Sequence, residues 1–510
     1  MMFRLRRFSR PSWRRTFFFL SGFFLFWIFV FSLTPITSPL PPYTGQHEVG
    51  ILDVEVEVQS RVISEGTLKE TGEKAFELST LAITLYYPSA LPTNPLKPQP
   101  WARPWLPQPI SLIGTGYARL IHIYFPPFQA AITFLLWALG SKTVIPGVVD
   151  APLLTGQERI LIDESGGAQG LGRIINAAKN AEKEGDKWIV GGGEEESALG
   201  TLPVVVFTHG MAGMSQSYSH YLGSIASHGY VVAAVEHRDG SGPGTVIHYP
   251  DGKERKVWHL EHQDVNSEPP MTARDLQIAQ LAFREAEIQE TIRFFKSLNE
   301  GSGAELQNLK PESPQGSLPG FKDRLNLAAV TVIGHSYGAT GALQALKNAE
   351  SDELPVNGGI ALDPGKGSGP LNKNIQVPVL IMQSGEWTEK QTEFYGQGWH
   401  FDVVKKLSQS VRQAWFMTLT GTAHPSCTDA PLIVPWIMRL VTGTTLDPRV
   451  ALREYTDVSV QFLDFLRDGK KRGVLDAQAA SPDGPLGEAG NRKTVKGTQG
   501  AEWEVHVVPQ

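Results

Sequence analysis

The chain has 510 residues, enough for two or three domains of ordinary size. Its 46 lysines and arginines against 52 aspartates and glutamates give a formal charge of −6, unlike the basic surface of a nucleic-acid-binding protein. Hydrophobic residues make up 41% of the chain, which excludes wholesale disorder. Cys427 is the only cysteine, so the chain can form neither an internal disulfide nor a thiolate metal cluster.

The N-terminal sequence predicts attachment to a membrane. Residues 1–15 carry six arginines and no acidic residue, and Thr16–Leu33 is an uncharged stretch with eight phenylalanines. Eighteen helical residues span about 27 Å, just enough to cross a hydrocarbon core. The positive-inside rule keeps the arginines in the cytoplasm, so we expect the rest of the chain in the lumen or outside the cell.

These observations divide the N-terminus into three expected parts: a basic cytoplasmic tail at 1–15, a transmembrane signal anchor at 16–33 and a Pro-rich stalk at 34–45. The alternative is a signal peptide whose cleavage releases a secreted protein. The sequence TPITSPLPP after Leu33 contains no small-residue cleavage site, which favours the uncleaved, single-pass anchor.

Short apolar runs alternate with helical patterns from residue 46 to 466. The expected strands are Leu81–Tyr87, Leu202–Thr208, Tyr230–Val235, Leu327–Ile333, Gly359–Leu362, Val377–Met382 and Ala414–Leu419. The expected helices are Ser219–His228, Met271–Asn299 and Ala339–Ala349. This alternation is typical of an α/β domain in which helices cover both faces of a mainly parallel sheet. Apolar periodicity fades afterwards, so we expect 467–510 to be a disordered tail.

One pentapeptide indicates the chemistry. Gly334–Gly338 reads Gly-His-Ser-Tyr-Gly, which fits G-x-S-x-G, and it lies between an expected strand and an expected helix. In this context the turn presents the Ser336 hydroxyl above the sheet as a nucleophile. The Tyr337 N–H then lies at a helix N-terminus, where it can stabilise an oxyanion.

A serine nucleophile needs a base and an acid that orients the base, and in this fold they follow it in the order acid, histidine. His424 comes directly after an expected strand, whereas His400 has no strand ahead of it and His506 lies in the expected disordered tail. Asp363 and Glu386 both follow expected strands. Position alone therefore leaves the choice of acid open.

Two further segments have residues of interest near expected strand ends. The segment 207–213 reads FTHGMAG, which makes the Met211 N–H the best candidate for a second oxyanion donor, with Gly210 allowing close approach of the backbone. The segment 236–239 reads EHRD, but neighbouring side chains diverge, so we expect structural ion pairs around the site entrance. No metal motif is apparent, and we expect neither a metal ion nor another cofactor.

A second apolar stretch, Phe128–Leu139, is too short to span a bilayer. It can form a core helix. Alternatively, it forms a helix whose side chains Phe134, Leu135, Trp137 and Leu139 rest on a lipid surface beside the active site.

Five blocks of sequence together resemble the platelet-activating factor acetylhydrolase family, the lipoprotein-associated phospholipase A2 type of α/β-hydrolase. They occur in the family's order, within 75–440, and are PVVVFTHG at 203–210, ASHGY at 226–230, AAVEHRD at 233–239, IGHSYGA at 333–339 and GIALD at 359–363. The resemblance implies a calcium-independent serine esterase that removes acetyl, short or oxidised sn-2 acyl chains from phospholipids.

Carried over by position, the resemblance makes Ser336 the nucleophile, Asp363 the acid and His424 the base. Met211 and Tyr337 then supply the oxyanion amides. The mechanism implied is acyl transfer to the serine, followed by hydrolysis of the acyl-enzyme.

The resemblance also implies partners, and the sequence departs from it in places. The family's membrane-docking helix corresponds to 128–139, so a phospholipid substrate and a membrane are the expected partners. Pro-Gly-Lys-Gly follows Asp363 where a bulky aromatic residue is expected, and 155–200 is a long insertion. Two other functions stay open: an α/β-hydrolase carboxylesterase that acts on non-lipid esters, and a membrane-tethered binding protein without turnover.

Overall fold

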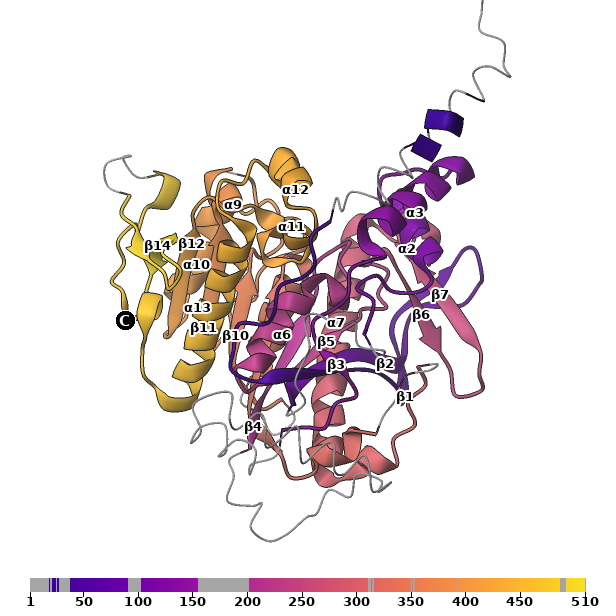
Figure 1. Ribbon diagram of the computed structural model, residues 1–510, viewed down its shortest axis with the longest axis horizontal. Helices are drawn as coiled ribbons and strands as arrows, with labels where there is room; N and C mark the ends of the chain where they lie inside the picture. Colours follow the sequence, from indigo (N-terminus) through magenta and orange to yellow (C-terminus); the bar gives the residue numbers. More distant parts are fainter. Residues whose placement is uncertain are drawn as a thin grey trace, which may run out of the picture.

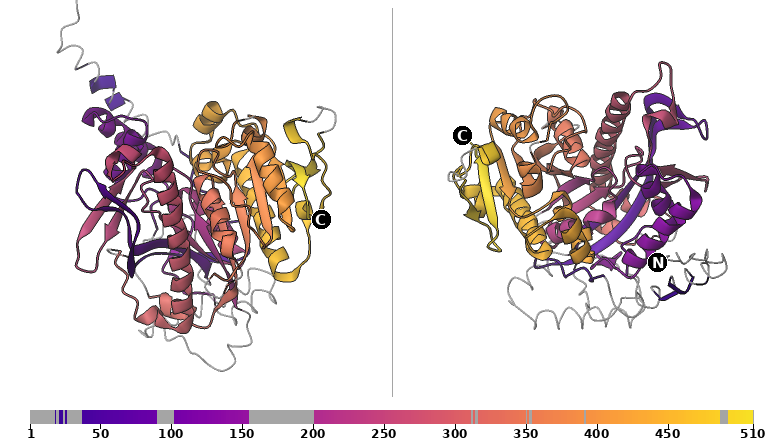
Figure 2. Two further views of the ribbon diagram at one scale, coloured as in Figure 1. Left: turned by 180° about the vertical axis from the view of Figure 1, so that it is seen from behind. Right: turned by 90° about the horizontal axis from the view of Figure 1, so that it is seen from above.

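A large mixed sheet with helices on both faces organises the protein (Figures 1 and 2). The computed structural model describes residues 18, 21–23, 25–26, 37–89, 102–154, 201–310, 313, 316–349, 351, 354–390, 392–486 and 492–509. The sheet of twelve strands has the order β13-β14-β12-β11-β10-β9-β4-β5-β2-β1-β3, with β8 paired to β1.

The centre of the sheet is parallel, as the alternating pattern predicts. The parallel strands in spatial order are β5 (Val231–Val235), β4 (Leu202–Thr208), β9 (Leu325–His335), β10 (Val356–Leu362), β11 (Val379–Ser384) and β12 (Ala414–Leu419). All six contain apolar runs because helices bury both faces of the sheet. Their carboxyl ends meet at one edge, so residues that follow different strands collect there.

Four strands, all but one of them antiparallel to a neighbour, extend one side of the sheet. They are β1 (Glu48–Leu68), β2 (Lys74–Ser89), β3 (Val148–Val149) and β8 (Val265–Asn266); β3 alone runs parallel to its neighbour β1. The predicted strand at 81–87 is the second half of β2. Sequence analysis misses β1, whose acidic residues interrupt the apolar run. A separate hairpin consists of β6 (Gly244–His248) and β7 (Glu254–Trp258).

The helices enclose one core on each face of the sheet. On one face lie α7 (Ala273–Glu300), α8 (Tyr337–Ala345) and α10 (His400–Ser410), and on the other α6 (Ser219–Ser227) and α13 (Pro448–Asp468). Alternate residues of β4 serve the two cores: Val204 and Val206 face the first, and Val205 and Phe207 the second. Further α-helices in the described part of the chain are α2 (Ile110–Leu120), α3 (Pro126–Gly140), α9 (Gly385–Glu389), α11 (Ala430–Ile433) and α12 (Pro435–Thr442).

The prediction of a disordered tail from residue 467 is wrong for the described residues. The strand β14 (Glu502–Val507) pairs antiparallel with β12, and β13 (Val495–Lys496) pairs with β14. Trp503 is fully buried, and its indole N–H donates to the Glu454 carboxylate at 3.0 Å. The strand is short and acquires its hydrogen-bonding partner only from distant β12, which local periodicity does not reveal.

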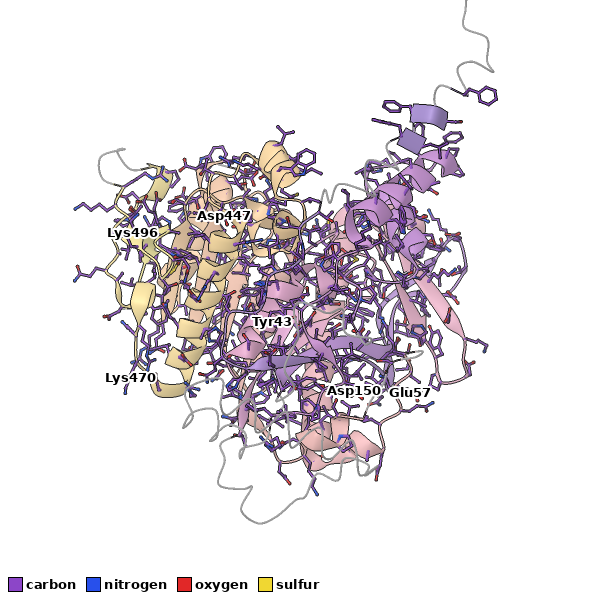
Figure 3. All side chains as sticks on the ribbon, in the orientation of Figure 1. Tyr43, Glu57, Asp150, Asp447, Lys470 and Lys496 are labelled. Atoms are coloured by element: carbon purple, nitrogen blue, oxygen red, sulfur yellow. The ribbon has the colours of Figure 1, made fainter. Side chains whose placement is uncertain are left out.

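The prediction of a free stalk at 34–45 is also wrong for the part that is described. The Ser38 N–H donates to the Ile433 carbonyl at 2.8 Å, and the Gly45 N–H donates to Ser227 Oγ at 2.8 Å. The Tyr43 ring packs against Gly223 of α6; Figure 3 labels Tyr43 near the middle of the molecule. This segment is therefore a strap bound to the domain, because Tyr43 contributes apolar area that a stalk would leave exposed.

The expected anchor and insertion lie almost entirely outside the described residues. Only residues 18, 21–23 and 25–26 of the segment 16–33 are described, and the insertion at 155–200 is not. Among the helices that the structure describes, none has the length and apolarity to cross a bilayer. The basic tail at 1–15 lies outside the described residues as well.

Candidate active site

Ser336 occupies a sharp turn between β9 and α8. Its backbone has φ 57° and ψ −120°, a left-handed conformation that a non-glycine residue adopts rarely. The flanking glycines are necessary: a Cβ on Gly334 would lie 2.2 Å from the Gly338 carbonyl oxygen, and one on Gly338 would lie 2.0 Å from that of Thr208. Ser336 is partly exposed at the edge of the sheet where the parallel strands end.

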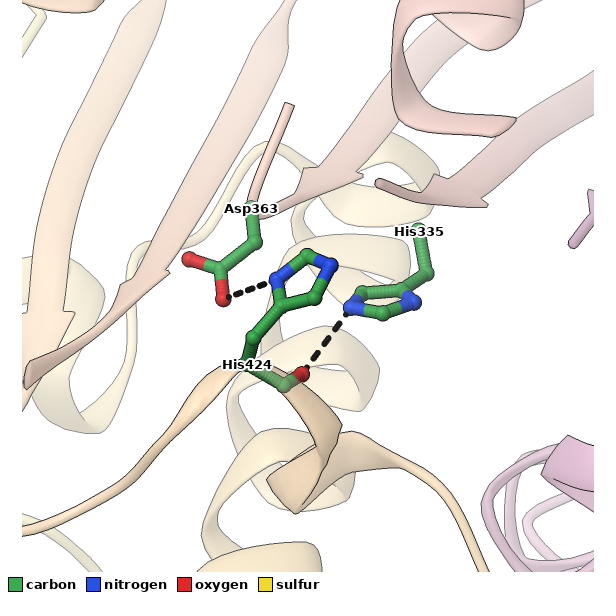
Figure 4. A group of neighbouring side chains, drawn as sticks. All are labelled: His335, Asp363 and His424. Atoms are coloured by element: carbon green, nitrogen blue, oxygen red, sulfur yellow. Dashed lines mark hydrogen bonds and ion pairs between the residues drawn. The ribbon is translucent and has the colours of Figure 1, made fainter. Parts of the chain in front are cut away.

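Three residues from distant parts of the chain form a hydrogen-bonded series at this edge. His424 Nε2 lies 2.9 Å from Ser336 Oγ, and His424 Nδ1 lies 3.0 Å from Asp363 Oδ2 (Figure 4 shows the second contact). Ser384 fixes the Asp363 carboxylate through its N–H and its hydroxyl, both at 2.7 Å. An ionised Asp363 accepts the Nδ1 proton, which leaves Nε2 free to take the serine proton.

Glu386, the other candidate for the acid, contacts the backbone of the histidine and not its ring. Its Oε2 accepts the His424 N–H at 3.0 Å, and its second oxygen pairs with Lys390. Burial acts to raise the pKa of Glu386, but the hydrogen bonds from Lys390 and His424 outweigh it and lower that pKa below its ordinary value. Glu386 therefore holds the loop that carries His424.

His335 lies beside His424, and the two could bind a metal ion together with Asp363. Ligand atoms of His335, Asp363 and His424 all lie within 4.8 Å of one another (Figure 4). However, His335 Nε2 donates to the His424 carbonyl at 3.1 Å, and its Nδ1 lies 2.7 Å from the Tyr218 hydroxyl. Burial, together with nearby His424, lowers the pKa of His335 well below its ordinary value. We interpret His335 as a neutral hydrogen-bonding support for the loop that carries His424.

The two predicted oxyanion residues lie in backbone segments that adjoin Ser336. Tyr337 is the first residue of α8, where an N–H has no acceptor within the helix. The N–H groups of Gly210 and Ala212 are hydrogen-bonded, whereas no described residue accepts from the Met211 N–H between them. A Cβ on Gly210 would lie 3.0 Å from the Ser336 Cβ, so this loop passes directly beside the serine.

Sequence analysis misses Trp387, which packs on the imidazole of His424. The indole and the His424 imidazole are stacked, with centroids 4.0 Å apart and planes at 6°. Trp387 lies in α9, after β11, and so provides an aromatic residue at the site although none follows Asp363. An aromatic residue directly after the candidate acid Glu386 is the signal that could have identified it.

The EHRD segment at 236–239 forms ion pairs, as predicted, but they are buried beneath the site and not around its entrance. Arg238 pairs with Glu55 at 2.8 Å, and Asp239 pairs with Arg284 at 2.7 Å. The four side chains of these two ion pairs are almost inaccessible to solvent. These pairs join β5, β1 and α7 and have a structural role.

The apolar helix α3 is not a core helix, because Gly140 is its only fully buried residue. Leu135 and Trp137 are 54% and 48% exposed, and Phe134 is partly exposed. Leu139, at the end of the helix, is partly buried and packs against the core, so it offers less apolar area to a lipid surface than Leu135 and Trp137 do.

Sequence analysis also misses the apolar surface of α12. This helix has no buried residue, and it exposes Trp436, Leu440 and Val441. It follows the histidine loop and lies at the same end of the molecule as α3 in two views (Figures 1 and 2). Two exposed apolar helices therefore lie at one end of the protein.

A family model described as platelet-activating factor acetylhydrolase, isoform II, matches residues 189–478, more than half of the chain. The chain belongs to this family. It is a carboxylic ester hydrolase, as its relatives are. The match contains the turn at Ser336, both candidate acids and His424.

Curated relatives agree with this membership. A putative phospholipase A2 of Schizosaccharomyces pombe is 27% identical over 298 residues, 52% of this chain and 68% of that protein. The platelet-activating factor acetylhydrolase of Cavia porcellus is 25% identical over 364 residues, 68% of this chain and 72% of that protein. The acetylhydrolase of Gallus gallus is 28% identical over 244 residues, 44% of this chain and 52% of that protein.

A solved structure shows the same fold. A ferulic acid esterase from Streptomyces cinnamoneus superposes with a TM-score of 0.51 at 17% identity, covering 88% of this chain and 98% of that one. Together with the parallel sheet, this supports the predicted α/β-hydrolase fold.

Proposed function

We propose that this family member is a serine esterase that cleaves the sn-2 acetyl, short or oxidised acyl ester of phospholipids without calcium. The hydrogen-bonded series Ser336–His424–Asp363, in a chain of this family, is the observation that carries the proposal. The reaction needs no metal ion because protein groups supply the nucleophile, the base and the oxyanion donors.

The reaction proceeds through an acyl-enzyme. His424 Nε2 takes the Ser336 proton as Oγ attacks the sn-2 carbonyl carbon, and the N–H groups of Met211 and Tyr337 hold the resulting oxyanion. The ester C–O bond breaks, and His424 returns the proton to the departing glycerol oxygen. His424 then takes a proton from water as the water oxygen attacks the acyl carbon; the bond from that carbon to Ser336 Oγ breaks, His424 returns the proton to Oγ, and the carboxylic acid leaves. Asp363 stabilises the imidazolium in both steps.

A substrate series tests this proposal. We expect a higher kcat/KM for ether phospholipids with an sn-2 acetyl group than for the same lipids with a long sn-2 chain, with and without added chelator. Initial rates of fatty-acid or acetate release provide the measurement, and heat-denatured protein provides the blank. A consistent preference for esters that contain no lipid would instead support the carboxylesterase alternative.

We propose two modes of membrane attachment. The segment 16–33 anchors the chain with its catalytic domain in the lumen or outside the cell, and the exposed side chains of Leu135 and Trp137 contact the lipid surface. Exposed Trp436 and Leu440 on α12 add apolar area at the same end of the molecule. The substrate resides in this surface, so such contact brings the active site to it.

Removal of residues 1–36 separates the two modes. We expect the full chain to leave membranes only with detergent, and the shortened chain to bind phosphatidylcholine vesicles reversibly. The double change Leu135→Ser and Trp137→Ser in the shortened chain should reduce vesicle binding at least tenfold, since each lost apolar side chain removes about 1.5–3 kcal/mol of burial. Vesicle flotation measures this, and unchanged binding would contradict the role of α3.

A further inference from the structure

The loop that follows Asp363 lies directly on the nucleophile. The Gly365 N–H donates to the Ser336 carbonyl at 2.9 Å, and a Cβ on Gly365 would lie 3.1 Å from the Tyr337 nitrogen. His400 Nε2 lies 2.7 Å from the Pro364 carbonyl oxygen. Lys366 follows Gly365 directly, so the backbone that carries this lysine contacts the active site.

The backbone on the other side of Lys366 is fixed as well. Gln277 donates to the Gly367 carbonyl at 2.6 Å, and the Ser368 hydroxyl lies 2.6 Å from that of Thr340 in α8. The loop is thus bound to α7 and α8 around a single lysine. A fixed backbone of this kind lowers the entropy that the lysine loses when it binds a ligand.

Lys366 places a positive charge near Trp387, the aromatic residue that packs on His424. Its Nζ lies 5.1 Å from the centroid of the Trp387 ring, which itself stacks on His424. No carboxylate in the described part of the chain lies within 4.0 Å of this Nζ, and nearby Glu386 pairs with Lys390 instead. The cation is partly exposed and so can reach a ligand.

We propose that Lys366 binds the phosphate of the substrate headgroup and selects phosphate-bearing esters over neutral ones. The sn-3 phosphate of a glycerophospholipid lies only a few covalent bonds from the sn-2 carbonyl, so a bound substrate places both at this site together. Charge-assisted hydrogen bonds to phosphate are among the strong polar contacts of proteins. The inference rests on the proposed function and names the headgroup chemistry that the site recognises.

The test compares two substrates, each presented in micelles of a neutral detergent, that differ only in the headgroup. They are 1-alkyl-2-acetylglycerophosphocholine and 1-alkyl-2-acetylglycerol. Lys366→Met should raise KM for the first about tenfold or more and leave kcat, and both constants for the second, nearly unchanged. Lys366→Arg should retain most of the selectivity, and Lys366→Glu should reduce it further. Lys373→Met, which removes an exposed lysine further along the same loop region, is the matched control.

Added salt provides a second measurement. The KM of the wild type for the phosphate-bearing substrate should rise with ionic strength, and that of Lys366→Met should rise less, because screening weakens a charge pair. Equal changes for both substrates, or no change, would overturn the role of Lys366. If the wild type cleaves neither lipid, the proposed function itself fails, which is a different outcome. Equal melting temperatures show that the variants fold.

Discussion

Replacing Ser336 by alanine is expected to lower kcat roughly 10⁵- to 10⁶-fold for every ester that the protein cleaves. The change removes the oxygen that forms the acyl-enzyme, while the oxyanion amides and the binding surface remain. Alanine also lacks the hydroxyl that lies 2.9 Å from His424 Nε2, so the base has no proton to accept. Steady-state rates and labelling by a fluorophosphonate probe provide the measurements.

A matched variant shows whether the loss is specific to Ser336 or follows from any change of serine to alanine. Ser410→Ala removes a hydroxyl at the end of α10 that donates to the Leu407 carbonyl and has no other partner among the described residues, and it should retain both activity and labelling. Labelling of the wild type at another residue, or its failure in folded protein, would refute the assignment of the nucleophile. Failure would also favour the binding-protein alternative.

The second large effect is expected for the acid: Asp363→Asn should lower kcat roughly 10⁴-fold. The asparagine amide would donate to His424 Nδ1, which favours the tautomer that carries its proton on Nε2. That tautomer cannot take the serine proton. The volume of the side chain is unchanged, so the loss reports the chemistry of the carboxylate.

Glu386→Gln is the control that compares the two carboxylates. Its amide oxygen can still accept the His424 N–H, although the ion pair with Lys390 is lost. We expect less than a tenfold loss of kcat, because an ion pair this close to solvent contributes little. The ratio of the two losses decides between the acids: a larger loss in Glu386→Gln would assign the role to Glu386.

The sequence alone was sufficient for the features that depend on neighbouring residues. Buried parallel strands appear as continuous apolar runs because both of their faces are covered, and the parallel strands accordingly have nearly their predicted bounds. The turn at Ser336 is likewise local, because its glycines, preceding strand and following helix are contiguous. The family blocks belong to these same segments.

Features that depend on distant segments required the tertiary structure. Asp363 and Glu386 both follow strands, but β10 pairs with β9, whereas β11 lies one strand farther from the nucleophile. That order brings the carboxylate of Asp363 to the imidazole and leaves that of Glu386 at the backbone.

The same reason explains β14 and Trp387. A six-residue strand such as β14 has no stable pairing of its own, and β12 supplies it from far away in the chain. Trp387 stacks on His424 only because the fold brings together α9, which carries the tryptophan, and the loop after β12, which carries the histidine. Composition and local pattern thus determined the fold class and the candidate nucleophile, and the order of strands in the sheet decided which groups surround it.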